Sequence, residues 1–227
     1  MKSRPNIAID GPAGAGKSTV AKLVAKELGF LYIDTGAMYR AVTLKALREE
    51  VNFSDYNGLD QLAAAARVKL VAGADADLKV FLNNEEVTEA IRDPEVSRNV
   101  SLLARVPSVR KRMVELQKAM AVGGGVVMEG RDIGTAVLPD APVKIFLTAS
   151  IEERARRRRE ELAAKGDIIG QRQMEEEIIL RDQVDTSREK DPLAPARDAE
   201  IIDSTCHSVE HVVAMIVARV KTWRYKT

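Results

Sequence analysis

A glycine-rich octapeptide near the start of the chain constrains the fold more than any other feature of the sequence. The segment Gly11–Ser18 reads GPAGAGKS and matches the phosphate-binding pattern G-x-x-x-x-G-K-[ST]. The apolar run Asn6–Asp10 precedes it and suits a buried strand, and Thr19–Leu28 follows it with helical periodicity. Strand, loop and helix therefore come in the order that places backbone N–H groups and the positive end of a helix against phosphate oxygens.

Two side chains of this loop suit the chemistry of such a site. Lys17 is expected to neutralise the β- and γ-phosphates of a nucleotide, and the Ser18 hydroxyl is expected to hold Mg²⁺. An ordinary glycine turn can spell the same pattern, but the strand and the helix around it favour phosphate binding. The residues expected to contact the nucleotide are Gly11, Pro12, Ala13, Gly14, Ala15, Gly16, Lys17, Ser18 and Thr19.

The composition is that of an ordinary soluble protein of a reducing compartment. The 227 residues include 35 Lys and Arg against 34 Asp and Glu, and a net charge of +1 provides no electrostatic footprint for nucleic acid or an anionic membrane. Cys206 is the only cysteine, which excludes an internal disulfide. No secretory signal is recognisable, and the longest apolar run, Val212–Val217, is too short to cross a bilayer. A cytoplasmic location is therefore expected.

Apolar runs alternate with helical patterns along the chain. This alternation predicts an α/β fold with a parallel sheet that carries helices on both faces. The closing segment Ser208–Lys221 reads as an amphipathic helix. The expected strands, rich in Val and Ile as buried parallel strands are, are Asn6–Asp10, Leu31–Asp34, Val126–Met128, Val143–Thr148 and Ala199–Asp203.

We expect residues 1–227 to form a single domain. Two regions of this domain depart from the alternation of apolar runs and helical patterns. Residues 60–100 contain short runs that predict a small antiparallel sheet inserted into the fold. These runs are Arg67–Val71, Leu78–Leu82 and Glu85–Val87. Residues 151–190 are arginine-rich, highly charged and helical, with a break at Gly166.

Polar residues follow the second and third expected strands, at the edge where open α/β sheets bind ligands. Within Asp34–Arg40, Thr35 is placed to cap a helix and Arg40 can form two parallel hydrogen bonds with a phosphate. Glu129–Asp132 follows the third strand and offers a cation for phosphate and carboxylates for metal-bound water or a base edge. Taken alone, a solvated Arg40 and a structural ion pair at 129–132 are the simpler interpretations.

Arginines are dense in the charged region. Arg154 and Arg158 stand four residues apart and share a helix face, and Arg181, Asp185 and Arg188 recur at helical spacing. Neighbouring glutamates make a solvated face the simpler explanation of the first group. Beside a phosphate loop, however, the two groups predict a closing lid, because phosphoryl transfer needs cations around its transition state and the exclusion of water.

In these segments the chain resembles the bacterial cytidylate kinases, P-loop nucleoside monophosphate kinases that phosphorylate CMP and dCMP from ATP. Gly11–Thr19, Asp34–Arg40 and Glu129–Thr135 look like the signature segments of that family, and the likeness runs from Ile7 to the last helix. The resemblance implies a three-layer fold with a five-stranded parallel sheet, an acceptor-binding insert at residues 60–100 and a helical lid at residues 151–190. It also implies direct in-line transfer of the γ-phosphate of Mg²⁺-ATP, without a general base or a covalent intermediate.

The resemblance further implies roles for single residues. Arg40, Arg131 and Arg181 would clamp the CMP phosphate, and Arg154 and Arg158 would approach ATP. Ser101, Arg110 and Asp132 would read the cytosine edge, while Asp185 and Arg188 would help to hold the ribose. The expected CMP-binding set is Thr35, Tyr39, Arg40, Ser101, Arg110, Arg131, Asp132, Arg181, Asp185 and Arg188. The expected catalytic set is Lys17, Arg131, Arg158 and Arg181, with Ser18 as the metal ligand for Mg²⁺.

The chemistry of the base supports this assignment independently. Cytosine carries an amino donor where uracil has a carbonyl, so the carboxylate of Asp132 would favour CMP over UMP while Arg110 donates to ring acceptors. Kinases of UMP, AMP or shikimate remain alternatives, as does a regulatory nucleotide switch, although the sequence contains no N-K-x-D guanine-reading motif. Expected partners are ATP and CMP or dCMP, with no nucleic acid and no membrane. The preference between CMP and dCMP stays open, and so does the oligomeric state, although a monomer would suit moving subdomains.

Overall fold

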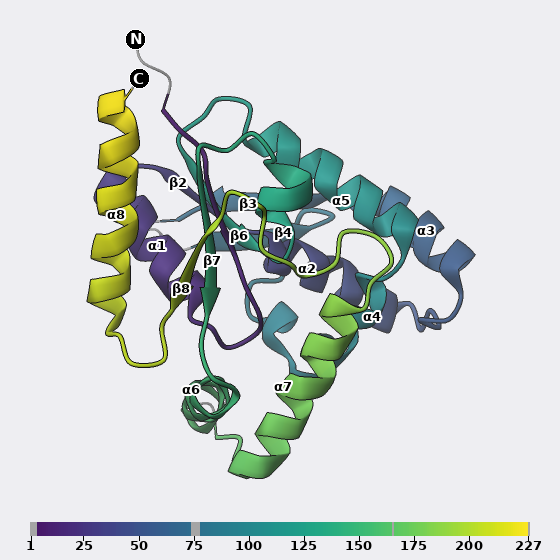
Figure 1. Ribbon diagram of the computed structural model, residues 1–227. Coiled ribbons are helices and arrows are strands. Elements are labelled where there is room, and N and C mark those ends of the chain that lie inside the picture. Colours follow the sequence, from purple (N-terminus) through teal and green to yellow (C-terminus); the bar gives the residue numbers. More distant parts are fainter. Residues whose placement is uncertain (1–3, 74–77, 165, 227) are drawn as a thin grey trace.

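The computed structural model describes residues 4–73, 78–164 and 166–226 and is built around a five-stranded parallel sheet (Figure 1). The strand order is β2-β6-β1-β7-β8, and every neighbouring pair runs parallel. The strands are β1 (Ile7–Asp10), β2 (Leu31–Asp34), β6 (Val126–Gly130), β7 (Val143–Thr148) and β8 (Glu200–Asp203). The expected sheet is confirmed, with β6 two residues longer than predicted and β1 and β8 each starting one residue later.

Helices cover both faces of this sheet, which makes three layers (Figure 1). Alternate residues of β1 face opposite layers. Ile7 and Ile9 pack with α1 (Lys17–Leu28) and α8 (Val209–Lys226), whereas Ala8 belongs to the cluster that contains η3 (Ile133–Val137). The α5 helix (Pro107–Met120) packs on the same side as η3, which is a π-helix. No helix in the described part of the chain is long and apolar enough to span a membrane.

The predicted insertion is a three-stranded antiparallel sheet with its own helices. Its elements and the helices around it are α2 (Thr35–Arg48), α3 (Tyr56–Ala65), β3 (Val68–Ala72), β4 (Leu78–Leu82), β5 (Glu85–Glu86), η2 (Ala90–Arg92) and α4 (Pro94–Leu103). Asn83 and Asn84, with φ of 51° and 72°, form the tight turn between β4 and β5. One hydrophobic cluster joins Met38 of α2, Val80 of β4 and Met113 of α5, so the insertion shares its core with the main domain.

Two further helices project from the sheet (Figure 1). They are α6 (Ile151–Ala163) and α7 (Gln171–Thr186), and a small cluster that includes Ala155 and Ile178 packs them together. The predicted helical stripe was wrong in one respect, because α7 ends at Thr186 and Arg188 lies in the loop that follows. That loop turns back at once, since the Leu193 N–H donates to the Asp185 carbonyl at 2.9 Å.

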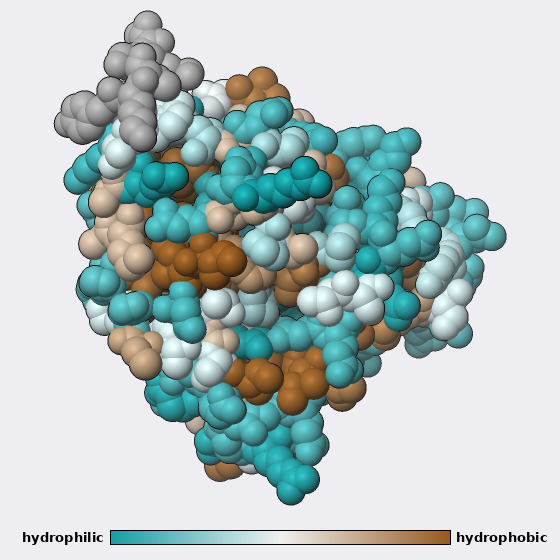
Figure 2. All heavy atoms as spheres, in the orientation of Figure 1, coloured by the Kyte–Doolittle hydropathy of each residue, from teal (hydrophilic) through white to brown (hydrophobic). Residues whose placement is uncertain are grey.

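Most of the surface is hydrophilic on the face shown in Figure 2. Apolar side chains gather over the strands β7 and β8 near the middle of this face. Ile201 of β8 is among the exposed large apolar residues. Residues 74–77 of the predicted insertion and residue 165 of the charged region lie outside the described residues.

Candidate active site

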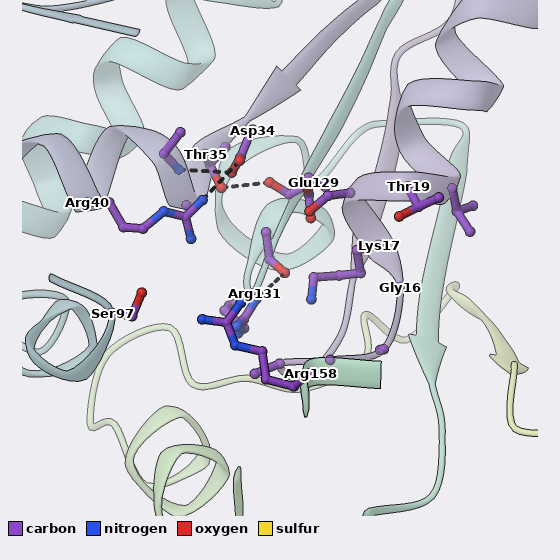
Figure 3. A pocket seen from close by; sticks show the side chains of 18 of the residues that line it. Gly16, Lys17, Thr19, Asp34, Thr35, Arg40, Ser97, Glu129, Arg131 and Arg158 are labelled. Atoms are coloured by element: carbon purple, nitrogen blue, oxygen red, sulfur yellow. Dashed lines mark hydrogen bonds and ion pairs between the residues drawn. The ribbon is translucent and has the colours of Figure 1, made fainter. Parts of the chain in front are cut away.

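A cavity of about 860 Å³ lies where β1, β2 and β6 end, between the glycine loop, the insertion, α6 and α7. Figure 3 shows Lys17, Arg40, Arg131 and Arg158 reaching into it from separate stretches of the chain. The predicted site residues that line it are Ala13, Gly14, Ala15, Gly16, Lys17, Ser18, Thr19, Thr35, Tyr39, Arg40, Ser101, Arg110, Arg131, Asp132, Arg158, Arg181, Asp185 and Arg188. Gly11, Pro12 and Arg154 are not part of its lining.

The glycine loop closes tightly over the end of β1. A Cβ at Gly11 would lie 1.9 Å from the Leu147 carbonyl oxygen of β7, so no side chain fits at that position. Gly16 adopts φ 87° as the N-cap of α1, a left-handed conformation that glycine tolerates best. Lys17 then folds back over the loop, and its Nζ donates to the Pro12 carbonyl at 2.7 Å. The loop is thus held against β7 and Lys17, and the first turn of α1 faces the cavity.

Buried cations crowd together beside this loop. Burial, followed by the charge of Arg131, lowers the pKa of Lys17 to about 7. Burial and Arg131 also lower the pKa of Arg181 to about 10, and Arg181 Nε has no hydrogen-bond partner within the described part of the chain. Cations that depress one another's pKa in a buried cleft mark a site that suits a ligand with several negative charges.

Asp185 of α7 organises two of the arginines. Its Oδ2 accepts from Arg131 Nε at 2.9 Å, and its carbonyl accepts from Arg188 Nε at 3.1 Å. Although burial opposes it, the charges of Arg131, Arg181 and Arg188 hold the pKa of Asp185 below its ordinary value. Among residues 4–73, 78–164 and 166–226, Arg188 Nη2 finds no partner. The carboxylate of Asp185 therefore fixes Arg131 and its backbone carbonyl fixes Arg188, while Arg188 Nη2 is left as a donor for a ligand.

A second charged group lies deeper, between α5 and the turn after β6. Arg110 is only 1% exposed, and its Nη2 donates to Asp132 Oδ2 at 2.5 Å and to Asp191 Oδ2 at 3.3 Å. The Tyr39 hydroxyl is buried nearby without a partner among the described residues, and burial together with Asp132 raises its pKa. Asp191 was missed from the sequence. The sequence feature that could have indicated it is the Asp191-Pro192 dipeptide, which is typical of a turn. In the structure Asp191 adopts φ 49°.

The turn from β2 into α2 corrects one prediction. Asp34, rather than Thr35, caps α2, because its Oδ1 accepts from the Ala37 N–H at 2.9 Å. Thr35 is the first helical residue, and its hydroxyl donates to the Glu129 carbonyl at 2.7 Å, which ties the start of α2 to β6 (Figure 3). Arg40 Nη2 pairs with Asp34 Oδ2 at 3.0 Å while lining the cavity. The capping carboxylate thus also orients an arginine.

Glu129 places a carboxylate beside the helical end of the glycine loop. It accepts from the Tyr32 hydroxyl at 2.8 Å and hydrogen-bonds with Ser18, and burial together with Asp34 raises its pKa. Oxygen donors of this kind suit Mg²⁺. In the ranges that the structure describes, no three His, Cys, Asp or Glu side chains converge as a metal cluster. An ion bound here would rely on phosphate oxygens and water besides Ser18.

The two lid-type arginines predicted on α6 have different environments. Arg158 lines the cavity and pairs with Glu161 Oε2 at 2.6 Å. Arg154 is buried, and its Nη1 donates to the Ala13 carbonyl at 3.2 Å and to Asp182 Oδ2 at 2.7 Å. It joins the glycine loop to α6 and α7 instead of facing the cavity.

Arg157 is a cavity residue to which the sequence assigned no role. Its guanidinium donates to the Ser204 carbonyl at 2.8 Å and to the Ala15 carbonyl at 3.4 Å, which links the end of β8 to the glycine loop. Within a run of four arginines nothing in the sequence distinguishes it. Only the tertiary structure decides which member of the run contacts Ser204 and the glycine loop.

Comparisons with known proteins agree with this geometry. The family model described as Cytidylate kinase matches residues 7–222. A cytidylate kinase from Pelotomaculum thermopropionicum is 68% identical over 224 residues, which cover 99% of each chain. One from Bacillus subtilis is 50% identical over 221 residues, 97% of this chain and 98% of that one. A solved structure of an uncharacterized protein from Eubacterium ventriosum, at 13% identity, covers 97% of this chain and 99% of its own with a TM-score of 0.52, a likeness of fold alone.

Proposed function

This chain belongs to the cytidylate kinase family, and we propose that it transfers the γ-phosphate of ATP to CMP, and to dCMP, in one in-line step. The observation that carries this proposal is the single cavity that joins the glycine loop to the Arg110–Asp132 pair. Arg131 and Arg181 lie between the glycine loop and this pair. Arg131 is in the turn between β6 and η3, and Arg181 is on α7. The cavity can therefore take a phosphate donor at the glycine loop and, next to it, an acceptor that carries a phosphate and a base.

The donor half of the reaction rests on the glycine loop. Its backbone N–H groups and Lys17 hold the β- and γ-phosphates, and the end of α1 adds a favourable dipole. Ser18 would hold Mg²⁺, with Glu129 close by as a further oxygen donor, and the ion would neutralise phosphate charge when bound. Arg157 borders the part of the cavity that continues past the loop towards Ser204. That part would accommodate the nucleoside of ATP.

The acceptor phosphate lies against Arg40, Arg131 and Arg181. A phosphate oxygen is already ionised at neutral pH, so it attacks the γ-phosphorus without a general base. Lys17 and Arg158 join these arginines around the transferred group, where charge spreads over the equatorial oxygens. Asp185 keeps Arg131 oriented through the 2.9 Å contact at Nε.

Base recognition is assigned to the deeper end of the cavity. Asp132 accepts from the cytosine amino group and Arg110 donates to the ring acceptors, with the Ser101 hydroxyl beside them. Asp185 and Arg188 approach the ribose. Tyr39 and Thr35 complete the lining around the acceptor. The Tyr39 hydroxyl has no hydrogen-bond partner among the described residues, so it is available to donate to the acceptor.

The insertion and the α6–α7 pair would close the site around both nucleotides. Residues 60–100 form the acceptor side and residues 151–190 bring Arg158 and Arg181 over the phosphates as a lid. Such closure excludes water, which would otherwise accept the phosphate. Partners are then the small-molecule substrates, and we propose a monomer that acts in the cytoplasm, in line with its nucleotide substrates and one exposed cysteine thiol.

A substrate panel tests the proposed reaction. ADP formation is followed by a coupled assay with CMP, dCMP, UMP, AMP and shikimate in turn. We expect ADP release to require a monophosphate and to be fastest with CMP or dCMP. Slow hydrolysis that ignores every acceptor would instead indicate a regulatory switch, and a shikimate response would indicate another small-molecule kinase.

Asp132→Asn tests the base assignment within the same assay. The amide cannot attract the cytosine amino group as the carboxylate does, and its NH₂ can donate to the uracil carbonyl. We expect the ratio of kcat/KM for CMP over UMP to fall about tenfold or more, while the KM for ATP stays close to its original value. An unchanged ratio contradicts the assigned role of Asp132.

A further inference from the structure

The carboxylate of Asp10 is buried beneath the cavity, and no step proposed above uses it. It is 3% exposed at the end of β1, and both of its oxygens are engaged. Oδ1 accepts from the Ile133 N–H and Oδ2 accepts from the Gly134 N–H, each at 2.7 Å. These N–H groups belong to the first residues of η3, a π-helix, a rare element that is frequent at functional sites.

This carboxylate connects the two halves of the site. Gly11 follows Asp10 directly and begins the glycine loop, while Asp132 directly precedes Ile133. A displacement of the Ile133 backbone therefore moves Asp132, and Arg131 with it. The packing is close, because a Cβ at Gly134 would lie 3.3 Å from Asp10 Oδ2 and 3.3 Å from Lys144 Cδ.

The environment of Asp10 argues against an incidental contact. Burial raises its pKa to about 6 although the two backbone hydrogen bonds lower it, so the carboxylate is ionised at neutral pH. Its nearest partners in the described chain are N–H groups rather than a cation, and a buried charge held in this way is costly. The charges of Asp132 and Lys17 both act on it, so a residue from each end of the site influences this carboxylate.

We propose that Asp10 is a positioning residue that holds Asp132 in register with the glycine loop, so that CMP-over-UMP selectivity depends on a carboxylate that touches neither nucleotide. The inference rests on the proposed function, in which Asp132 reads the base. Asparagine offers one acceptor oxygen, and its NH₂ would oppose the second backbone N–H. The start of η3 must then shift, and a shift of about 1 Å at a recognition group can cost up to about a hundredfold.

The test measures kcat/KM for CMP and for UMP in Asp10→Asn. The ratio of the two values does not depend on how much of the protein is active, so a merely destabilised protein leaves it unchanged. We expect the ratio to fall about tenfold. Asp55→Asn is the control, since the exposed Asp55 also accepts from a backbone N–H, that of Gly58 at 3.0 Å, and does not belong to the cavity lining. That variant should keep the original ratio.

Asp132→Asn, measured in parallel, separates the possible failures. If Asp132→Asn lowers the ratio and Asp10→Asn does not, the positioning role is overturned while base reading by Asp132 stands. If neither changes it, base reading fails and the inference fails with it.

Should Asp10→Asn not accumulate as folded protein, Gly134→Ala presses a methyl group against the same carboxylate. Its ratio should fall several-fold, whereas Gly123→Ala, which meets nothing within 4 Å, should not change it.

Discussion

Lys17, Asp10 and Glu129 are buried ionisable groups whose pKa values are all displaced towards neutrality by burial. Asp185 is the opposite case, because three arginines keep it ionised. The difference follows from neighbours, since the arginines beside Lys17 disfavour its charged form, whereas the arginines beside Asp185 favour its charged form. In the proposed reaction Lys17 would respond to the bound triphosphate, whereas Asp185 would hold the arginines that bind phosphate.

Lys17 should take up a proton when ATP binds. Because burial lowers its pKa to about 7, the amine loses its proton as the pH rises through that value, and a triphosphate that needs the ammonium form must restore it. Calorimetry of ATP binding in buffers of different ionisation enthalpy should report little uptake near pH 6 and close to one proton near pH 9. The affinity should fall by up to about tenfold per pH unit above the pKa. Lys17→Arg keeps its charge, and equal uptake in that variant would assign the proton to another group.

The helices α6 and α7 are elements whose positions depend on buried polar contacts as well as on apolar packing. Arg154 links both of them to the glycine loop through Asp182 and the Ala13 carbonyl. The loop also approaches α6 closely, since a Cβ at Gly14 would lie 3.0 Å from Arg154 Cβ. We therefore expect a displacement of these helices to change the shape of the phosphate loop.

A double-mutant cycle measures that coupling. Arg154→Ala, Asp182→Ala and the double variant are compared by urea unfolding, and we expect a coupling free energy of about 1–3 kcal/mol because the pair is largely buried. The control pair is Arg156 and Glu160 on the same helix, where both side chains are more than half exposed. Their coupling should be much smaller, as it is for solvated ion pairs. Equal couplings in the two cycles would contradict a linking role for Arg154.

The whole molecule contains apolar clusters on both faces of one sheet. The insertion shares a cluster with α2, α4 and α5, whereas α1 and α8 enclose another on the opposite face. Shared side chains mean that the insertion cannot lose its packing without exposing the core of α2 and α5. We therefore expect the molecule to unfold as one cooperative unit.

Leu59→Ala tests this cooperativity. Leu59 of α3 is fully buried in the cluster of the insertion, and its truncation should lower the free energy of unfolding by about 2–5 kcal/mol. Trp223, the single tryptophan, packs against the opposite cluster through α8. Its fluorescence should shift to lower denaturant together with the circular dichroism signal. A fluorescence transition left in place while part of the helical signal is lost would show that the insertion unfolds separately.

Features specified by neighbouring residues could be read from the sequence. The glycine loop, the five parallel strands and the small antiparallel sheet were predicted within one or two residues, because strand and helix periodicity and glycine spacing are local properties. The segments that line the cavity could also be chosen, since parallel strands deliver their carboxyl ends to one edge of the sheet. Local patterns thus predicted the elements of the fold and several segments that line the cavity, whereas the roles of single residues came from the family resemblance.

Tertiary structure alone decided which partner each side chain has. Arg154 and Arg158 share a helix face, yet one is buried against the glycine loop and the other lines the cavity. The Asp10 contact joins residues 123 positions apart, and periodicity shows which way a residue faces but not what packs across from it. Hydrogen bonds and buried charges act over a few ångströms, so their partners exist only once distant segments have been brought together by packing.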